Sequence, residues 1–227
     1  MIEMTSSSMR GRMRIGIGIA WILGSGVLTG CGGDRPATDR SSEPHRTPAK
    51  SGSAKSDQYH GIGGATGRTI MNFDLTSSAF ARGSKIPRRH TGDGEDLSPP
   101  LAWSQLPAGT LALALIVDDP DAPTPEPWIH WVLYNLKPDA SGLPEGISPV
   151  EKPAKPAGVV QGKNSWGGIG YRGPAPPKGH GLHHYRFRLY AIEKALDLEP
   201  GLDANALARA IHGHVLGVAE LQGTYER

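Results

Sequence analysis

Two aspartates are the residues of this chain whose type and spacing first suggest ligand chemistry. Asp119 and Asp121 flank Pro120. Because proline favours extended backbone at the preceding residue, and residues two apart in an extended segment point to the same side, we expect the two carboxylates to share one small space. An Asp-Pro-Asp segment is also a common turn at a strand end, in which the aspartates accept hydrogen bonds from backbone N–H groups. The segment alone leaves both roles open.

Four histidines could complete a site with these acids, namely His130, His180, His183 and His184. Histidine and aspartate are ordinary ligands of zinc and iron. The spacing argues against a metal, because none of the four forms a His-x-x-x-His pair on a helix or a His-x-His pair along a strand. We therefore expect no cofactor and keep a metal site as the less favoured alternative.

Nucleophilic catalysis has little support in the sequence. There is no Gly-x-Ser-x-Gly elbow, and Ser98 has no neighbouring base in the chain, although a serine could still meet His130 in space. The two aspartates are too close together for the paired acids of glycoside cleavage. We expect a protein that is not an enzyme, with a weak hydrolase built on the histidines and acids as the less favoured alternative.

Two predicted strands lead into these polar residues. The apolar run Leu111–Val117 is typical of a buried strand and ends just before the acids. The segment His184–Ile192 alternates between apolar and polar residues, which is typical of a half-exposed strand, and it begins next to His183. The ends of these strands would therefore bring acids and histidines together.

A third predicted strand follows His130. In the segment Trp131–Leu136, alternation places Trp131, Leu133 and Asn135 on one face and the intervening residues, Leu136 included, on the other. Both faces are mainly apolar, which indicates a strand in the middle of a packed sheet.

The remaining elements are short. Residues 70–75 are strand-like, Asp203 or Asn205 could cap a short helix, and residues 218–225 are extended. Residues 137–177 are rich in proline, glycine and lysine, and connections of this length tend to be functional. The expected fold class is mostly β, with one or two short helices at the edge.

The beginning of the chain has the features of a targeting sequence. Three arginines at positions 10, 12 and 14 precede the apolar run Ile15–Leu28, which is short for a membrane span and suits a signal peptide. The run ends in Leu-Thr-Gly-Cys, which resembles the bacterial lipobox, so we expect residues 1–31 to be a lipoprotein signal peptide and Cys31 to be acylated. An ordinary secretory peptide and a membrane span are the alternatives, and Met9 could equally be the true start. The expected location is the outer side of a cell membrane or the cell envelope.

The segment that follows differs from the rest of the 227-residue chain. Residues 32–68 contain almost no large apolar side chain and should form a flexible tether, which leaves residues 69–227 as one folded domain. The glycine-rich patch at residues 61–67 lacks the strand and the lysine of a nucleotide-binding loop. A net charge of +2 with scattered basic residues gives no reason to expect nucleic acid.

Several motifs in the folded domain occur together in a known family. They are Asp-Leu-Ser-Pro-Pro-Leu-Ala-Trp at 96–103, Asp-Pro-Asp-Ala-Pro at 119–123, Trp-x-His-Trp at 128–131, Gly-x-Asn-Ser-Trp-Gly at 162–167, Gly-Tyr-Arg-Gly-Pro-Ala-Pro-Pro-Lys-Gly at 170–179 and Leu-His-His-Tyr at 182–185. With these motifs the domain resembles the phosphatidylethanolamine-binding proteins, also called Raf kinase inhibitor proteins, and especially their bacterial branch. The resemblance covers essentially all of residues 69–227.

The resemblance implies a β-sandwich of two antiparallel sheets with a small pocket at one end. It also implies binding of phosphate-like anions and phospholipid head groups without a metal. The residues implied to bind the ligand are Asp119, Asp121, His130, Gly173, Pro174, Pro176, Pro177, His183 and Tyr185. Animal and plant members have arginine where this chain has His184, so the charge at that position is absent or depends on pH.

Two carboxylates should repel an anion, and two arrangements would resolve this conflict. In the first, the ammonium of a zwitterionic head group faces Asp119 and Asp121 while its phosphate accepts hydrogen bonds from His130, His183 and loop N–H groups. In the second, the acid pair retains a proton and donates it. We expect an envelope-anchored protein that binds such a ligand and reaches the membrane through its lipid anchor. The alternative is a regulator of a protein partner, such as a protease or an envelope kinase.

Overall fold

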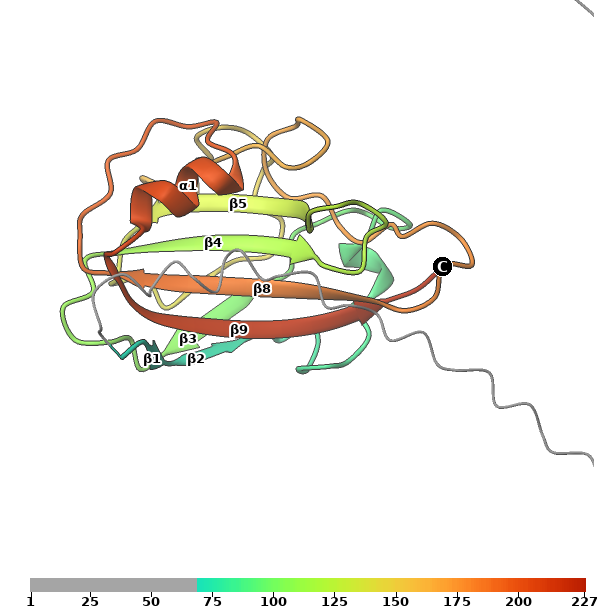
Figure 1. The fold of residues 1–227 in the computed structure, drawn as a ribbon, viewed down its shortest axis with the longest axis horizontal. Helices are drawn as coiled ribbons and strands as arrows, with labels where there is room; N and C mark the ends of the chain where they lie inside the picture. The colour runs from blue at the N-terminus through green and yellow to red at the C-terminus, as the bar shows by residue number, and fades with distance from the viewer. Residues whose placement is uncertain (1–68) are drawn as a thin grey trace, which may run out of the picture. The chain divides into compact units, whose positions relative to one another are not determined.

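The structure is a computed structural model that describes residues 69–227. These residues form a six-stranded sheet, a three-stranded sheet, an α-helix and a 3₁₀ helix (Figure 1). The strand orders are β1-β9-β8-β4-β5-β7 and β2-β3-β6. The elements are β1 (Met71–Asn72), β2 (Asp74–Thr76), η2 (Arg88–His90), β3 (Leu101–Ser104), β4 (Ala112–Asp119), β5 (Trp128–Leu136), β6 (Gly142–Leu143), β7 (Val160–Gln161), β8 (His183–Ile192), α1 (Ala204–Ile211) and β9 (Val215–Tyr225).

The mostly-β prediction is confirmed, with one difference in strand direction. All strand pairs within the two sheets are antiparallel except β1 and β9, which run parallel. The chain leaves β1 at the edge of the larger sheet and enters β2 of the smaller sheet after Phe73, which is buried between them. Apolar patterning does not encode this crossing, because it shows which side chains are buried and not which strand is the partner.

The predicted buried strand at Leu111–Val117 is confirmed as β4 from Ala112 onwards, and every residue of β4 is buried, whereas Leu111 precedes the strand and is exposed. Leu113, Leu115 and Val117 pack in the core between the two sheets, whereas Ala114 and Ile116 face the opposite side of the larger sheet. A strand covered on both faces is expected to be apolar throughout.

The predicted half-exposed strand is instead mostly buried. In β8, the residues from Phe187 to Ile192 are all buried. Tyr190 and Ile192 lie in a second apolar cluster with Leu207 and Ile211 of α1 (Figure 1). The helix begins after Asp203, whose side chain accepts a 2.7 Å hydrogen bond from the backbone N–H of Ala206 and so acts as the predicted cap.

Strand β5 departs from simple alternation. Its pairing with β4 shifts register, and Asn135 near the shift has a positive φ of 60°. Leu136 therefore packs in the same core cluster as Trp131 and Leu133, so the predicted division of faces is wrong at this end of the strand. The Asn135 amide donates to the carbonyl of Leu198 at 2.9 Å instead of joining that face.

The long proline- and glycine-rich stretch is ordered by one buried side chain. Gln161 donates through Nε2 to the carbonyls of Ser148 and Val150, both at 2.7 Å, and accepts through Oε1 from Trp131 Nε1, also at 2.7 Å. These bonds attach residues 148–150 to Trp131 of β5 through the side chain of Gln161.

The predicted signal peptide, the Cys31 anchor and the tether at residues 32–68 lie outside the described residues. Within residues 69–227, no helix has the length and apolar character needed to cross a bilayer.

Candidate functional site

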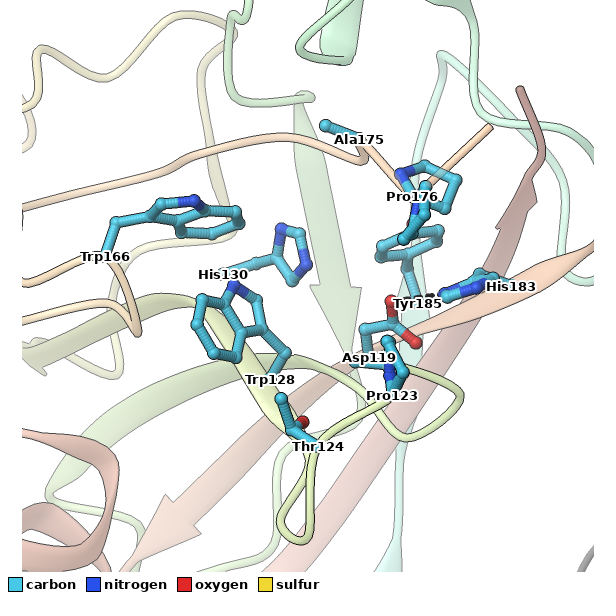
Figure 2. Close-up of a pocket in the computed structure, with 12 residues that line it drawn as sticks. Asp119, Pro123, Thr124, Trp128, His130, Trp166, Ala175, Pro176, His183 and Tyr185 are labelled. Atoms are coloured by element: carbon cyan, nitrogen blue, oxygen red, sulfur yellow. Dashed lines mark hydrogen bonds and ion pairs between the residues drawn. The ribbon is translucent and has the colours of Figure 1, made fainter. Parts of the chain in front are cut away.

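A pocket of about 220 Å³ opens where β4 ends and β5 and β8 begin (Figure 2). Because β4 is antiparallel to both neighbours, its last residue and their first residues meet at one end of the larger sheet. The residues that line the pocket are Asp119, Ala122, Pro123, Thr124, Trp128, His130, Trp166, Ala175, Pro176, Pro177, His183 and Tyr185.

Asp119 is buried at the polar end of this pocket and fulfils both roles left open by the sequence. Its Oδ2 lies 2.7 Å from His183 Nδ1, and its Oδ1 accepts a 2.8 Å hydrogen bond from the backbone N–H of Asp121. The carboxylate is therefore both a wall of the pocket and the acceptor that closes the strand-end turn.

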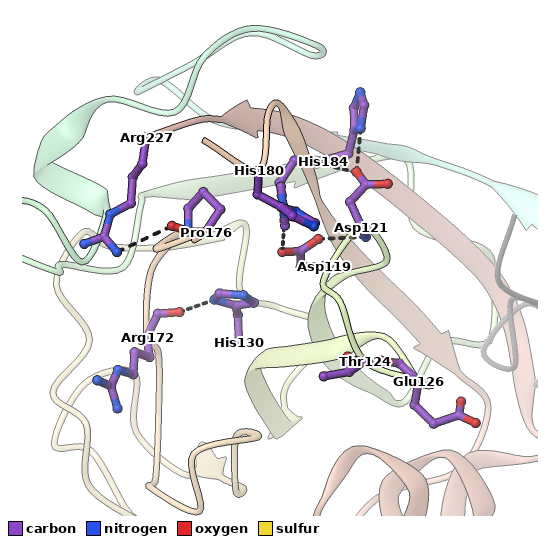
Figure 3. Close-up of polar contacts among 11 residues, drawn as sticks. Asp119, Asp121, Thr124, Glu126, His130, Arg172, Pro176, His180, His184 and Arg227 are labelled. Atoms are coloured by element: carbon purple, nitrogen blue, oxygen red, sulfur yellow. Dashed lines mark hydrogen bonds and ion pairs between the residues drawn. The ribbon is translucent and has the colours of Figure 1, made fainter. Parts of the chain in front are cut away.

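Asp121 takes a different position from the one expected. Its Oδ2 accepts hydrogen bonds from the backbone N–H of His184 at 2.8 Å and lies 2.7 Å from His184 Nδ1 (Figure 3). The side chains of Asp121 and His184 are each 41% exposed, and neither residue lines the pocket. Successive residues of a strand face opposite sides, so His183 and His184 each engage a different acid. The expectation that both carboxylates share one small space is therefore wrong.

His130 enters the pocket through an irregularity in β5. On β4, Val117 and Asp118 are consecutive, but their partners on β5 are Trp131 and Ile129, so His130 is an extra residue in this ladder. Such bulges occur next to functional sites because they re-aim a side chain.

The hydrogen-bonding state of His130 follows from its neighbours. Nδ1 lies 2.5 Å from the carbonyl oxygen of Arg172, which can only accept, so Nδ1 carries the proton (Figure 3). Burial lowers the pKa of the imidazole from 6.5 to about 4, and the ring is therefore neutral at pH 7. Nε2 then carries a lone pair and acts as a hydrogen-bond acceptor.

Tyr185 supplies the complementary donor. Its hydroxyl is buried beside Asp119 and makes no hydrogen bond of acceptable geometry within the described residues. Burial, together with the negative charge of Asp119, raises the pKa of the phenol far above its usual value, so the hydroxyl keeps its proton. The hydroxyl also interacts with Asp119, but not through a hydrogen bond of good geometry, so a ligand oxygen could accept a better one.

Both ring nitrogens of His183 have a partner within the protein. Its Nδ1 faces Asp119, and its Nε2 lies 2.6 Å from Nδ1 of His180. His180 was a candidate histidine in the sequence but was not among the expected ligand residues. The chain spacing of three residues gave no signal for this contact, because it depends on the turn that precedes β8.

The proline-rich loop contributes through its second half. Pro176, Pro177 and Ala175 line the pocket, whereas Gly173 and Pro174 lie behind it as supports. Prolines carry no N–H, so among the lining residues of this loop only Ala175 has a backbone donor, and the expected set of loop N–H groups is reduced to this one.

The two supporting residues hold the loop against residues 90–96. The N–H of Gly173 donates to Asp96 Oδ1 at 2.7 Å, and the carbonyl of Pro174 accepts from the N–H of Gly92 at 2.9 Å. A Cβ at position 173 would lie 2.3 Å from the His90 carbonyl oxygen, so only glycine fits there.

The outer walls of the pocket are apolar and aromatic. The rings of Trp128 and Trp166 meet edge to face with centroids 5.3 Å apart, and Trp166 meets the His130 ring in the same way at 5.1 Å. The guanidinium of Arg172 lies 4.6 Å from the centre of the Trp166 ring. These tryptophans were not among the expected ligand-binding residues, although both lie in the motifs that carry the family resemblance.

The arrangement can bind a ligand that both donates and accepts hydrogen bonds and that has an apolar part. Tyr185 donates, His130 Nε2 accepts, and Asp119 contributes a carboxylate whose charge is offset by the N–H groups around it. In residues 69–227, no three His, Cys, Asp or Glu side chains gather in a way that could hold a metal ion.

The fold and site together define a two-sheet β protein with a small-ligand pocket at the end of its larger sheet. Residues 76–226 match the family model described as phosphatidylethanolamine-binding protein. The chain belongs to this family, and its relatives place it in the bacterial and archaeal branch.

Two relatives in sequence are informative. A UPF0098 protein of Methanothermobacter thermautotrophicus is 49% identical over 154 residues, which cover 68% of this chain and 99% of the relative. LppC of Mycobacterium tuberculosis, named as a candidate lipoprotein, is 41% identical over 152 residues, which cover 67% of this chain and 71% of the relative.

Two solved structures are similar over the same region. Escherichia coli YbcL, described as a member of the mammalian PEBP family, has 31% identity and a TM-score of 0.64 over 68% of this chain and 98% of YbcL. The PEBP homologue CT736 of Chlamydia trachomatis has 41% identity and a TM-score of 0.62 over 69% of this chain and 98% of CT736.

Proposed function

We propose that this protein is an envelope-anchored binding protein for a small phosphate-containing ligand, such as a phospholipid head group. The observation that carries the proposal is the hydroxyl of Tyr185, which is buried beside Asp119 in the pocket that also contains the neutral His130 and makes no well-formed hydrogen bond to a described residue. One donor and one acceptor in a largely apolar pocket suit a ligand with both kinds of group.

In this proposal a phosphate oxygen accepts a hydrogen bond from Tyr185. A phosphate O–H or an ammonium N–H of the same ligand donates to His130 Nε2 or to Asp119. The walls formed by Trp128 and Pro176 cover the carbon atoms between these groups. In this arrangement no negatively charged phosphate oxygen has to lie against the carboxylate of Asp119.

The geometry favours one of the two charge arrangements considered from the sequence. Asp119 and Asp121 each accept from their own histidine and do not form a pair that could share a proton. This supports one half of the zwitterion arrangement, in which an ammonium faces an acid, with Asp119 alone as that acid. The other half changes, because His130 Nε2 is an acceptor and His183 Nε2 is covered by His180, so Tyr185 replaces them as the donor to the phosphate.

A binding role is proposed in preference to catalysis. In a buried Asp–His pair that acts as a general base, the outer nitrogen of the histidine meets a nucleophile. Here His183 Nε2 meets His180, within the part of the chain that the structure describes.

The proposed anchoring rests on the Leu-Thr-Gly-Cys motif and on the name of the LppC relative. Metabolic labelling with palmitate in a bacterial host tests it. Label on the wild type and none on Cys31→Ala would support the anchor, and equal labelling of both would contradict it.

Calorimetric titration of the full chain with phosphoethanolamine tests the binding role. We expect wild type to bind and Tyr185→Phe to bind about tenfold or more weakly, because the variant loses one hydrogen bond to a charged oxygen. Tyr190→Phe is the matched control, since Tyr190 lies on β8 in the apolar cluster under α1. Absence of binding by wild type, or equal affinity of wild type and Tyr185→Phe, would overturn the proposal.

A further inference from the structure

His180 lies on an exposed turn directly beside the pocket. Every residue of the segment 177–182 is exposed, yet the imidazole of His180 reaches the buried His183, with 2.6 Å between Nδ1 and Nε2. Because Asp119 occupies Nδ1 of His183, Nε2 is the nitrogen with which His183 could contact a ligand. In the structure that nitrogen is covered by another residue of the same chain.

The contact can exist only in certain protonation states. Asp119 keeps a proton on His183 Nδ1, so in the neutral pair His180 Nδ1 donates its proton to His183 Nε2. One added proton preserves the bond, since one of the two facing nitrogens still has a lone pair. When both rings are cationic, both facing nitrogens carry protons, so the hydrogen bond is lost and like charges face each other.

The turn that carries His180 has glycines on both sides. Gly179 and Gly181 have φ angles of 73° and 93°, and a Cβ at either position would meet nothing within 4 Å. The backbone of the turn donates from Gly179 N–H to the Arg227 carbonyl at 3.3 Å and from His180 N–H to the Pro177 carbonyl at 3.1 Å. Side-chain packing therefore does little to hold the turn against the pocket.

We propose that His180 is a displaceable cap on the pocket, which covers His183 Nε2 and leaves it when both histidines are protonated. The uncovered imidazolium of His183 then donates to an anionic oxygen of the ligand. This inference rests on the proposed binding of a phosphate-containing ligand and adds a gating residue and a proton-uptake step to it.

The charged groups around His180 and His183 have opposing effects on the protonation of this pair. The acids favour the doubly protonated pair, whereas neighbouring cations oppose it. The groups are Asp119 on β4, Asp121 in the following turn, His130 on β5, His184 and Tyr185 on β8, Arg227 after β9, and Lys178 on the turn itself. His130 stays neutral above about pH 4 and His184 is engaged by Asp121, so neither replaces His180 as the cap.

The cap makes ligand affinity depend on pH in a defined direction. Opening the cap takes up two protons from the neutral pair, so binding strengthens as the pH falls, by up to about a hundredfold per pH unit while neither ring is protonated and by up to about tenfold once one of them is. Removing the cap should strengthen binding at neutral pH and flatten this dependence, because His183 Nε2 is then open to the ligand.

Titrations of the full chain with inorganic phosphate and with phosphoethanolamine, at pH 5.5 and 7.5, test the inference. We expect His180→Ala to bind both probes on the order of tenfold more tightly than wild type at pH 7.5 and about equally at pH 5.5. His180→Asn, whose amide can replace Nδ1 without titrating, should remain capped and bind weakly at both values. His212→Ala, an exposed histidine that follows α1, is the matched control.

The outcomes separate the two proposals. If wild type binds but His180→Ala has the same affinity as wild type at both pH values, or a lower one, the cap is wrong and the binding role stands. If neither wild type nor His180→Ala binds either probe, both proposals are wrong. Stronger binding of phosphoethanolamine than of inorganic phosphate by all variants identifies the head group as the source of the phosphate.

Discussion

His183 and Asp119 are joined by a buried hydrogen bond of 2.7 Å between Nδ1 and Oδ2, and they come from the adjacent strands β8 and β4. Asp121 makes the corresponding contact with His184 at the exposed surface. The two pairs have the same chemistry and differ in burial, so they provide an internal comparison of what the buried pair contributes.

Replacing the buried acid should therefore be more costly than replacing the exposed one. We expect Asp119→Asn to lower the free energy of unfolding by about 1–3 kcal/mol, because a buried charge-assisted bond is lost. Asp121→Asn should change it by about 0.5 kcal/mol or less, as is usual for exposed positions. Urea denaturation at pH 7 measures both, and equal losses would contradict the assignment of Asp119 as the buried partner.

The neutral state of His130 predicts a pH-dependent stability. The unfolded chain binds this proton near pH 6.5 and the folded protein only near pH 4, so the stability associated with neutral His130 is complete above pH 6.5 and declines as the pH falls towards 4. The full difference corresponds to about 3 kcal/mol. Urea denaturation at pH 7.5 and 4.5 should show a smaller decline for His130→Gln than for wild type. An equal decline in both, with His212→Ala as control, would show that His130 is not the group responsible.

Arg227 should control the ionisation of Asp93. The guanidinium forms a two-pronged contact with this carboxylate, including bonds from Nε at 2.9 and 3.0 Å, and it holds the pKa of Asp93 near 2 instead of 3.8. We expect Arg227→Ala to raise this pKa towards 3.8 and Tyr225→Phe, which removes a single 2.9 Å hydrogen bond, to raise it less. Carbon-detected NMR titration of the carboxyl group gives both values, and a larger effect of Tyr225→Phe would reverse the proposed order.

The proline-rich loop should not tolerate a side chain at position 173. Gly173→Ala places a Cβ 2.3 Å from the His90 carbonyl oxygen and 2.8 Å from Asp96 Oδ1, so the loop must shift. We expect a loss of about 1–3 kcal/mol in stability, together with weaker phosphoethanolamine binding. Gly168→Ala is the control, because its nearest contact would be an ordinary 3.6 Å to Asn164. Thermal denaturation measures the stability of the two variants, and calorimetry measures their phosphoethanolamine binding. Equal stability and equal affinity of Gly173→Ala and Gly168→Ala would show that the loop can adjust and would contradict the prediction.

Much of the fold could be predicted because burial leaves a direct trace in the sequence. The strand at Leu111–Val117 was visible because both faces of β4 are covered, and the cap at Asp203 because its role is local. The position of Leu136 on the same face as Trp131 and Leu133 could not be predicted, because it results from a register shift in the pairing of β5 with β4. The burial of Tyr190 was missed for a similar reason, since α1 covers it from later in the chain.

The site was predicted in its residue types more than in its contacts. Asp119, His130, His183 and Tyr185 do line one pocket, as the family resemblance implied. Asp121 does not line the pocket, because its carboxylate contacts His184, which lies 63 residues later in the chain. The sequence does not show that His184 faces Asp121 while His183 faces Asp119. The proton on His130 Nδ1 depends on a carbonyl 42 residues away, and no local pattern encodes that contact.

The parallel pairing of β1 with β9 fixes where the chain enters the domain. Met71 lies opposite Gly217, whereas His183, beside the pocket, lies opposite Tyr225 at the other end of β9. Eight residues of strand separate these points by about 26 Å. The chain therefore joins the larger sheet at the end remote from the pocket. Whatever is attached ahead of Met71 is thus tied to the domain at the end of the sheet opposite the ligand entrance, and a pull applied there would load β1 and β9 before it reached the pocket residues.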